Sequence, residues 1–402
     1  MIEDLLKEHH QEHILRWFEE LSISQKADFT RQIESVDWKT VELWKCPDEV
    51  LGGGKVEPID VLTVEKIEQK RSEYFEIGRK VVKAGKVAAV MLAGGQGTRL
   101  GSDAPKGMFN IGITRPLYIF EQQIKNLLEA CEECGGYAPL FIMTSEKNDT
   151  ATRSFLKEHN YFGYPEEQVR FFVQEMAPSV DFQGKLLLEE KGRLALSPNG
   201  NGGWYSSLLR AKILDDFPEI EWFNAFSVDN VLQRIADPVF VGATIASGKM
   251  SGSKGVRKAY PEEKVGVLCL QGGLPSVIEY YDLDAERANL RDEQGNLVYS
   301  FGVTLNYLFR ADKLKEIAEK HIPVHIVKKK VPYLDERGEL ISPETENGYK
   351  FETLILDMVR LMETCLPFEI VREKEFAPVK NKTGVDSVDT ARELLRKNGV
   401  EL

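Results

Sequence analysis

The sequence lacks the features that mark membrane-spanning, secreted and nucleic-acid-binding proteins. Nowhere do about 18 apolar residues follow one another, which is the length that a membrane-spanning helix needs. The first residues, Met1 to Asp4, are acidic rather than basic, so we expect no secretory signal. Basic residues are also in deficit, with 52 Lys and Arg against 64 Asp and Glu and a net charge of −12. Because nucleic acids and anionic membranes attract basic surfaces, we expect neither as a partner.

Cysteine and histidine are both scarce, with five and six copies in 402 residues. An odd number of cysteines without a secretory signal predicts reduced thiols and a cytoplasmic protein. Cys131 and Cys134 have a metal-like spacing, but no second cysteine or histidine pair matches it, so we predict two apolar positions on a helix. His9, His10 and His13 cluster on a charged helix, where a solvated face is the favoured interpretation over a metal site.

The chain is long enough for two or three domains, since single cores rarely exceed about 250–300 residues. Residues 1–85 have helical periodicity, with Ser24 as a candidate cap of the second helix and a third helix over 63–83. Residues 86–374 alternate apolar strands with amphipathic helices, which predicts an α/β fold with a mixed, mainly parallel sheet flanked by helices. Residues 375–402 form a short C-terminal segment.

The pattern within 86–374 is specific enough to place individual elements. Ligands of such sheets bind at the carboxyl ends of the strands, so these ends are where we look for function. A group of shorter strands at 265–270, 276–281 and 299–306 predicts an antiparallel extension. The expected parallel strands are 87–92, 140–143, 169–173 and 222–228, and the expected helices are 116–130, 150–158 and 204–214.

The most informative segment is Leu92–Gly101, Leu-Ala-Gly-Gly-Gln-Gly-Thr-Arg-Leu-Gly, which directly follows the first expected strand. Its glycines leave no β-carbons in the way, so a ligand can approach the backbone N–H groups. Arg99 and Lys106 add two cations, and this combination predicts a polyphosphate site rather than a simple glycine-rich turn. The spacing fits neither the P-loop, which needs Lys followed by Ser or Thr, nor the dinucleotide fingerprint.

Two polar residues directly follow other expected strands of the sheet. Asp229 follows the strand at 222–228, where a carboxylate can hold Mg²⁺ against phosphate oxygens. The alternative is an aspartate that caps the next helix. Gln174 follows the strand at 169–173, and its amide both donates and accepts, as a uracil edge requires.

Weaker candidates lie further along the chain. The second glycine-rich loop, residues 198–203, contains Asn201, which can contact a base edge or a hydroxyl group, although Asn-Gly pairs are also ordinary turns. Glu279 can bind adjacent sugar hydroxyls or simply face solvent, and the sequence favours neither interpretation over the other. Lys380 and the basic run 328–330 are further candidates for phosphate contacts.

Together these segments resemble the UDP-sugar pyrophosphorylase family, and within it the UDP-N-acetylhexosamine pyrophosphorylase branch. The resemblance covers roughly residues 60–392. The motifs that carry it are Leu92–Gly101, Pro105–Met108, Phe171–Gln174, Gly200–Gly203, Val228–Asn230, Ala236–Pro238, Val265–Val267, Val277–Tyr280, Lys329–Tyr333 and Pro378–Asn381.

The resemblance implies a Rossmann-like nucleotidyltransferase core and the reaction of UTP with a sugar 1-phosphate, with Mg²⁺, to give a UDP-sugar and pyrophosphate. N-acetylglucosamine 1-phosphate is the sugar phosphate that the branch implies. Carried over by motif, Leu92, Ala93, Gly94, Gly95, Gln174 and Gly200 would bind the nucleotide, Arg99 and Lys106 the pyrophosphate, Asp229 the metal and α-phosphate, Asn201, Gly266, Glu279 and Asn306 the sugar, and Lys380 its phosphate.

Two departures from the family pattern open alternatives. The branch has an asparagine where this chain has Val303, which raises a glucose- or galactose-type pyrophosphorylase with the same mechanism as the second hypothesis. The chain also ends soon after Lys380, at Leu402, which suggests a bacterial-type member. A non-catalytic nucleotide-sugar sensor is the third hypothesis. Against it weighs the joint presence of Arg99, Lys106, Asp229 and Lys380.

Overall fold

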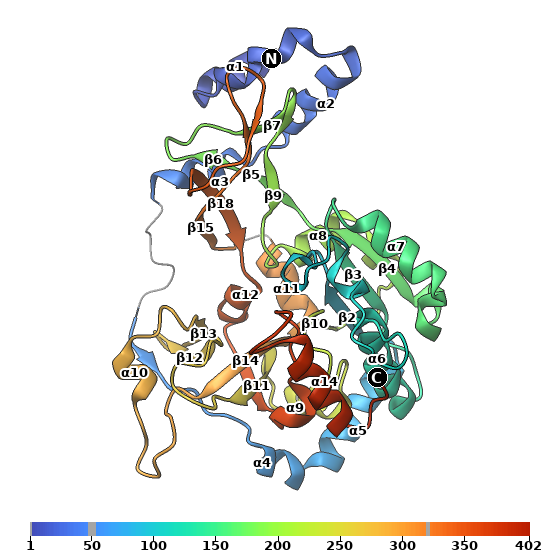
Figure 1. Ribbon diagram of the computed structural model, residues 1–402. Helices are drawn as coiled ribbons and strands as arrows, with labels where there is room; N and C mark the ends of the chain where they lie inside the picture. The colour runs from blue at the N-terminus through green and yellow to red at the C-terminus, as the bar shows by residue number, and fades with distance from the viewer. Residues whose placement is uncertain (1, 47–53, 319–321) are drawn as a thin grey trace. The chain divides into compact units, whose positions relative to one another are not determined.

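The computed structural model describes residues 2–46, 54–318 and 322–402, and it divides the chain into two compact units (Figure 1). Each unit is described by itself below. The first unit comprises Met1–Gly52, Gln174–Gly203 and Ile322–Ile355, and the second comprises Gly53–Val173, Trp204–His321 and Leu356–Leu402.

These bounds differ from the three consecutive segments 1–85, 86–374 and 375–402 that the sequence predicts. Residues 53–85 and 375–402 belong to the second unit, because their helices contribute to the same core as its sheet. Residues 174–203 and 322–355 lie within the expected α/β segment but belong to the first unit, because their apolar side chains pack on the N-terminal helices.

The first unit combines short helices with small antiparallel sheets. Its core joins Leu6 and Phe29 of the helices to Leu188 and Phe351 of the strands. The second helix begins after Ser22, which forms a capping box with Gln25, so the expected cap at Ser24 is wrong by two residues. The helices are α1 (Ile2–Glu8), η1 (Glu12–Glu20), α2 (Ile23–Glu34), α3 (Trp38–Glu42) and η2 (Leu43–Lys45). The strands are β5 (Met176–Pro178), β6 (Val180–Asp181), β7 (Leu188–Glu190), β8 (Arg193–Leu194), β9 (Leu196–Pro198), β15 (Val324–Lys329), β16 (Tyr333–Leu334), β17 (Leu340–Ile341) and β18 (Gly348–Thr353).

The second unit is built on a mixed sheet of ten strands among the described residues. Its parallel part has the order β10-β2-β3-β4, and the order continues through β14, β12 and β1 on the other side of β10. The strands are β1 (Val56–Glu57), β2 (Val87–Leu92), β3 (Leu140–Thr144), β4 (Val169–Val173), β10 (Trp222–Ser227), β11 (Ser251–Arg257), β12 (Val267–Gln271), β13 (Leu274–Ile278), β14 (Phe301–Arg310) and β19 (Cys365–Glu369). The predicted antiparallel extension is confirmed, with β12 paired to β13 and β14.

Helices cover both faces of this sheet. Trp222 and Phe226 of β10 join the core that α6 contributes to, whereas Phe223, on the opposite face, contacts the Trp204 ring of α8. The third expected N-terminal helix is two helices, α4 and α5. The helices are α4 (Val64–Gln69), α5 (Arg71–Lys83), η3 (Thr98–Leu100), η4 (Lys106–Met108), α6 (Ile119–Cys134), α7 (Asp149–Glu158), η5 (Asn160–Gly163), η6 (Glu166–Gln168), α8 (Trp204–Arg210), η7 (Ile213–Asp216), α9 (Pro238–Ala246), α10 (Ala285–Asn289), α11 (Ala311–Ala318), α12 (Ile355–Leu361), α13 (Arg372–Glu375) and α14 (Val388–Lys397).

Helices α5 and α9 approach each other closely through two glycines. A Cβ added to Gly78 would lie 1.9 Å from the Pro238 carbonyl oxygen, and one added to Gly242 would lie 1.7 Å from the Tyr74 carbonyl oxygen. Any side chain at either position would therefore force the helix backbones apart. This contact fixes α5, which precedes β2, against α9, which follows β10.

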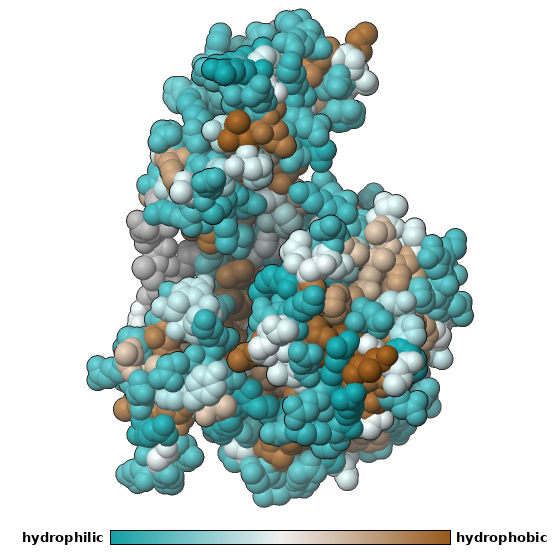
Figure 2. Space-filling model, viewed as in Figure 1, coloured by the Kyte–Doolittle hydropathy of each residue, from teal (hydrophilic) through white to brown (hydrophobic). Residues whose placement is uncertain are grey.

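Polar residues cover most of the face shown in Figure 2, and hydrophobic residues appear there in separate patches. No helix of the described residues combines the length and apolar content that crossing a bilayer requires.

Candidate active site

The glycine-rich loop leaves the middle of the sheet at the end of β2. Leu92 pairs with Met143 of β3 on one side and with Ser227 of β10 on the other. The loop then closes on itself, with the Gly97 N–H donating to the Ala104 carbonyl oxygen (2.9 Å) and the Lys106 N–H to the Gly95 carbonyl oxygen (3.2 Å). The predicted loop is thus a narrow, hydrogen-bonded turn at the carboxyl edge of the parallel strands.

The space beside Gly95 is open. A Cβ built on this glycine would meet no heavy atom within 4 Å, and the residue is exposed. Its φ does not lie in the left-handed region, so conformation alone does not require glycine here. A ligand that approaches the backbone at Gly95 is therefore a physical reason for a residue without a side chain.

Asn148 holds this loop from behind and was missed by the sequence analysis. Its fully buried amide donates to the carbonyl oxygens of Ala93 (2.9 Å) and Gly95 (3.4 Å). Its Oδ1 accepts the Ser145 N–H (2.7 Å), which ties the loop to the end of β3. The available signal was an asparagine just beyond the carboxyl end of a neighbouring strand.

Lys106 and Asp229 meet at the same edge. Lys106 lies in η4 and is only 7% exposed, and its Nζ is 2.7 Å from Asp229 Oδ1. Asp229 follows β10, the strand next to β2. Arg99, in η3, is exposed, and within the described part of the chain it has no hydrogen bond or ion pair. The structure thus brings Lys106 and Asp229 into contact and leaves Arg99 open to solvent.

The segment that carries Lys380 pairs with the segment that carries Asp229. The Val379 N–H donates to the Asp229 carbonyl oxygen (2.9 Å), and Asn230 forms an antiparallel bridge with Pro378. The Lys380 Nζ lies 3.1 Å from Asp386 Oδ2 at a partly exposed position. Residues 150 positions apart in the sequence therefore meet at one edge of the sheet.

Two of the candidate sugar contacts lie together, and with them Val303. The Val303 N–H donates to the Gly266 carbonyl oxygen (2.9 Å). A Cβ built on Gly266 would lie 3.4 Å from Glu279 Oε2 and 3.6 Å from Val303 Cγ2. The sequence analysis expected Glu279 within a strand at 276–281, but β13 ends at Ile278 and Glu279 directly follows it.

Asn306 does not join this group. Its side chain is fully buried, its Oδ1 accepts from Asn224 Nδ2 (2.8 Å), and its Nδ2 donates to Gln233 Oε1 (3.2 Å) and to the Arg234 carbonyl oxygen (3.3 Å). A substrate contact would have to reach this buried side chain, and the expectation that Asn306 lines the sugar site stays a prediction. Its alternation along β14 turns it into the core.

The remaining candidates belong to the first unit. Gln174 is buried and directly follows β4 along the chain. A Cβ at Gly200 would lie 2.1 Å from the Thr353 carbonyl oxygen, so close packing on β18 already requires glycine there. Asn201 Oδ1 accepts the Ile355 N–H (2.9 Å), which holds the chain at the end of β18.

The sequence analysis favoured interpretations without a metal for the cysteine pair and the histidine cluster. Among the described residues no group of three or more His, Cys, Asp or Glu is arranged to hold a metal ion. Cys131 and Cys134 are buried in the hydrophobic core, which confirms their apolar role. His9 stacks on Trp38, with ring centroids 4.2 Å apart, and lies near Glu42.

A family model described as UTP–glucose-1-phosphate uridylyltransferase matches residues 29–391. The human UDP-N-acetylhexosamine pyrophosphorylase-like protein 1 is 35% identical over 96% of this chain and 81% of its own length. The UDP-N-acetylglucosamine pyrophosphorylase of Saccharomyces cerevisiae is 36% identical over 85% of this chain and 75% of its own. The crystal structure of the uridine diphosphate N-acetylglucosamine pyrophosphorylase of Trypanosoma brucei with an inhibitor has a TM-score of 0.83 and 27% identity, covering 98% of this chain and 83% of that one. These relatives are all eukaryotic, so the expectation of a bacterial-type member is not borne out.

Proposed function

Because the chain belongs to the UTP–glucose-1-phosphate uridylyltransferase family, we propose that it converts UTP and a sugar 1-phosphate into a UDP-sugar and pyrophosphate. The observation that carries this proposal is the meeting of an open glycine loop, the ion pair of the buried Lys106 with the partly exposed Asp229, and the Lys380 segment at one sheet edge. A polyphosphate and a second phosphate both need cations and backbone N–H groups, and this edge supplies them.

The reaction needs positioning rather than a protein base. A phosphate oxygen of the sugar 1-phosphate is already an anion and attacks the α-phosphorus of UTP. The new O–Pα bond forms as the bond from Pα to the bridging oxygen breaks, and pyrophosphate leaves with that electron pair. Lys106 and Arg99 neutralise the departing pyrophosphate, and Lys380 holds the attacking phosphate.

The residues at the sheet edge fit a bound Mg²⁺. Magnesium usually takes one or two protein carboxylates and completes its shell with phosphate and water oxygens, and Asp229 offers one partly exposed carboxylate. When bound, the ion would neutralise charge on the α-phosphate. Asp229 is therefore the residue that we propose holds it. Chelating the divalent ion should abolish turnover and leave the protein folded.

For the sugar we propose N-acetylglucosamine 1-phosphate, in line with what the names of the yeast and Trypanosoma relatives state for those proteins. The Val303 methyl group beside Gly266 and Glu279 favours a second candidate, glucose or galactose 1-phosphate. An apolar methyl group cannot donate a hydrogen bond to an acetamido oxygen, so this position weakens the argument for an acetylated sugar.

A panel assay tests both candidates. Pyrophosphate release is measured with UTP, Mg²⁺ and N-acetylglucosamine, N-acetylgalactosamine, glucose or galactose 1-phosphate, with ATP, CTP and GTP as controls. We expect release with UTP and an N-acetylhexosamine 1-phosphate. Release only with non-acetylated sugars would replace the first candidate by the second. Tight UDP-sugar binding without any release would overturn the enzyme proposal in favour of a sensor.

A further inference from the structure

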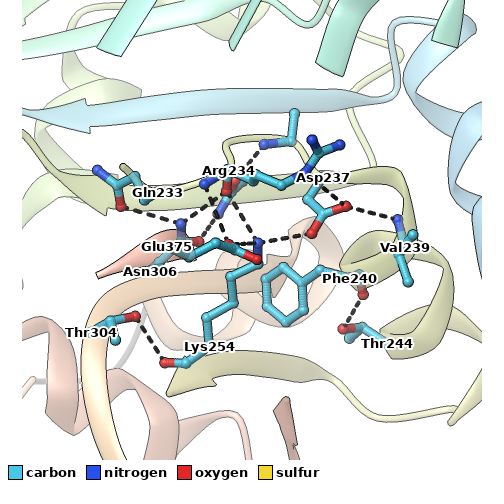
Figure 3. Close-up of polar contacts among 12 residues, drawn as sticks. Gln233, Arg234, Asp237, Val239, Phe240, Thr244, Lys254, Thr304, Asn306 and Glu375 are labelled. Carbon is cyan, nitrogen blue, oxygen red and sulfur yellow. Dashed lines mark hydrogen bonds and ion pairs between the residues drawn. The ribbon is translucent and has the colours of Figure 1, made fainter. Parts of the chain in front are cut away.

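Lys254, in β11, is a lysine with no exposed surface, and it sits among charged partners (Figure 3). Its Nζ lies 2.8 Å from Asp237 Oδ2 and 2.6 Å from Glu375 Oε2, and it also donates to the Arg234 carbonyl oxygen (3.3 Å). A buried ammonium group is strongly destabilising unless it is paired and hydrogen-bonded. The ammonium and the two carboxylates are therefore held together by their burial.

Arg234 is a second cation beside the Asp237 carboxylate, and it also pairs with Glu133. Its Nη2 lies 2.8 Å from Glu133 Oε2 and its Nε 3.8 Å from Asp237 Oδ1. Burial disfavours the charged guanidinium, yet Asp237 and Glu133 raise the pKa of Arg234 above its ordinary value. Burial likewise disfavours the Asp237 carboxylate, but Lys254 and Arg234 lower its pKa. Arg234 and Asp237 are therefore both charged, and the contacts among Lys254, Asp237, Glu375 and Arg234 hold these side chains in place.

The network continues to the candidate active site through Glu375 and Asn230. The backbone carbonyl oxygen of Glu375 accepts from Asn230 Nδ2 (2.7 Å), and Asn230 Oδ1 accepts the Ala377 N–H (2.8 Å). Asn230 thus clamps two positions of the segment that leads to Lys380. Its neighbour Asp229 receives the Val379 N–H, so the clamp sets which residues of the two segments face each other.

Stability alone does not explain this arrangement. Replacing a buried ion pair by well-packed apolar residues is often neutral or stabilising, whereas ionic groups accept partners only in defined directions. The segment from Glu375 to Lys380 is short, and its backbone pairing with residues 229–231 consists of two hydrogen bonds, from the Val231 N–H to the Ala377 carbonyl oxygen (3.2 Å) and from the Val379 N–H to the Asp229 carbonyl oxygen (2.9 Å). A directional anchor at Glu375 adds to this short pairing and restrains where the segment starts.

We propose that Lys254, Glu375 and Asn230 are positioning residues that set the register of Lys380 against Asp229. The proposal concerns a register that exists without substrate, and its kinetic part rests on the role proposed above for Lys380. Loosening the anchor should misplace the Lys380 ammonium, and small misplacements of a positioning group reduce rates severely.

The first experiment measures amide hydrogen exchange and does not depend on activity. Glu375→Gln keeps the side-chain shape and removes the charge that Lys254 contacts. We therefore expect exchange at residues 377–380, where every residue but Pro378 has an amide hydrogen, to accelerate by about 10-fold or more. Glu121→Gln is the matched control, because Glu121 is 12% exposed against 14% for Glu375 and also has a lysine 2.6 Å away. The control should leave residues 377–380 unchanged.

A second variant covers the case in which Glu375→Gln does not fold. Asn230→Asp retains the acceptor for the Ala377 N–H and removes the donor to the Glu375 carbonyl oxygen, while the Lys254 pairs stay intact. It should accelerate exchange at the same residues. Unchanged exchange at 377–380 in a folded variant would overturn the proposal.

The kinetic experiment separates positioning from general destabilisation. In Glu375→Gln we expect the KM for the sugar 1-phosphate to rise about 10-fold while the KM for UTP changes less than about twofold, because only the Lys380 segment moves. In a Lys380→Ala background, Glu375→Gln should add no more than about a twofold effect. Equal effects in both backgrounds would show that Glu375 does not act through Lys380. If the parent protein releases no pyrophosphate with any sugar, the proposed function fails, whereas the exchange experiment still tests the register.

Discussion

Lys106 is a nearly buried cation whose ammonium lies 2.7 Å from the Asp229 carboxylate at the edge of the sheet. Burial fixes the position of the Lys106 side chain, which therefore lacks the many conformations that a surface lysine can adopt. Arg99 differs, since it is exposed on η3 and can turn toward a ligand. One of the two cations is thus held in place by the protein, whereas the other is exposed to solvent.

We predict that Lys106→Ala and Arg99→Ala each lower kcat by about 100-fold or more, the effect of removing one charge-stabilising group. Steady-state pyrophosphate release measures this, with Arg79→Ala as the control, because Arg79 pairs with Glu76 on α5. Near-normal turnover in both variants would remove these residues from the site.

Asn148 carries a second prediction at this scale. Asn148→Ala removes a fully buried amide that bonds to the loop and to Ser145, so we expect a loss of about 1–3 kcal/mol in the free energy of unfolding and a higher KM for UTP. Thr152→Val is the control, because Thr152 is equally buried in α7 and, among the described residues, its hydroxyl has no partner. Urea denaturation that gives equal losses for both variants would contradict the anchoring role.

At the scale of elements, the carboxyl ends of β2 and β10 determine where the site is built. The parallel strands could be predicted from sequence because strands buried on both faces appear as continuous apolar runs, and the fully buried β2 has the predicted bounds 87–92. Strand β14 extends four residues beyond the expected end, since pairing with β10 and β11 continues there. Pairing between distant strands leaves no local signal, so neither this extension nor the burial of Asn306 could be predicted from the sequence.

The contact between α5 and α9 gives a prediction for an element pair. Gly242→Ala should lower the free energy of unfolding by about 2 kcal/mol, because the new methyl group meets the Tyr74 carbonyl oxygen. Alanine otherwise stabilises a helix by about 1 kcal/mol relative to glycine, so a loss reports the contact. Lys80→Ala on the exposed side of α5 should change stability by less than about 0.5 kcal/mol. A stabilised Gly242→Ala variant would show that the helices can separate freely.

At the scale of the whole molecule, each unit joins segments that are far apart in the sequence. The length of the chain predicted more than one domain, but no local pattern showed that 174–203 and 322–355 complete the core of the N-terminal helices. Their apolar residues meet those helices only in three dimensions. The same holds for 375–402, whose α14 contributes Val388 and Leu395 to the core beside the sheet.

The exposure of the cysteine thiols gives a prediction that covers both units. Of the five cysteines, Cys46 is exposed and the other four are buried. Burial raises the pKa of Cys134, Cys269 and Cys365 to about 12, so these groups stay protonated and unreactive near pH 8. We expect a thiol reagent to modify one group in the folded protein and five after denaturation. Rapid modification of more than one thiol in the folded state would contradict this burial.

The open space beside Gly95 has a practical consequence. Gly95→Ala adds a methyl group that meets no protein atom within 4 Å, so the melting temperature should stay within about 1 °C of the parent. The same methyl group would stand where the nucleotide backbone contact is made, so UTP binding measured by calorimetry should fall by about 10-fold or more. Undiminished binding would move the nucleotide away from this loop. Such a variant separates folding from recognition and would serve as a nucleotide-blind reference protein for ligand screens.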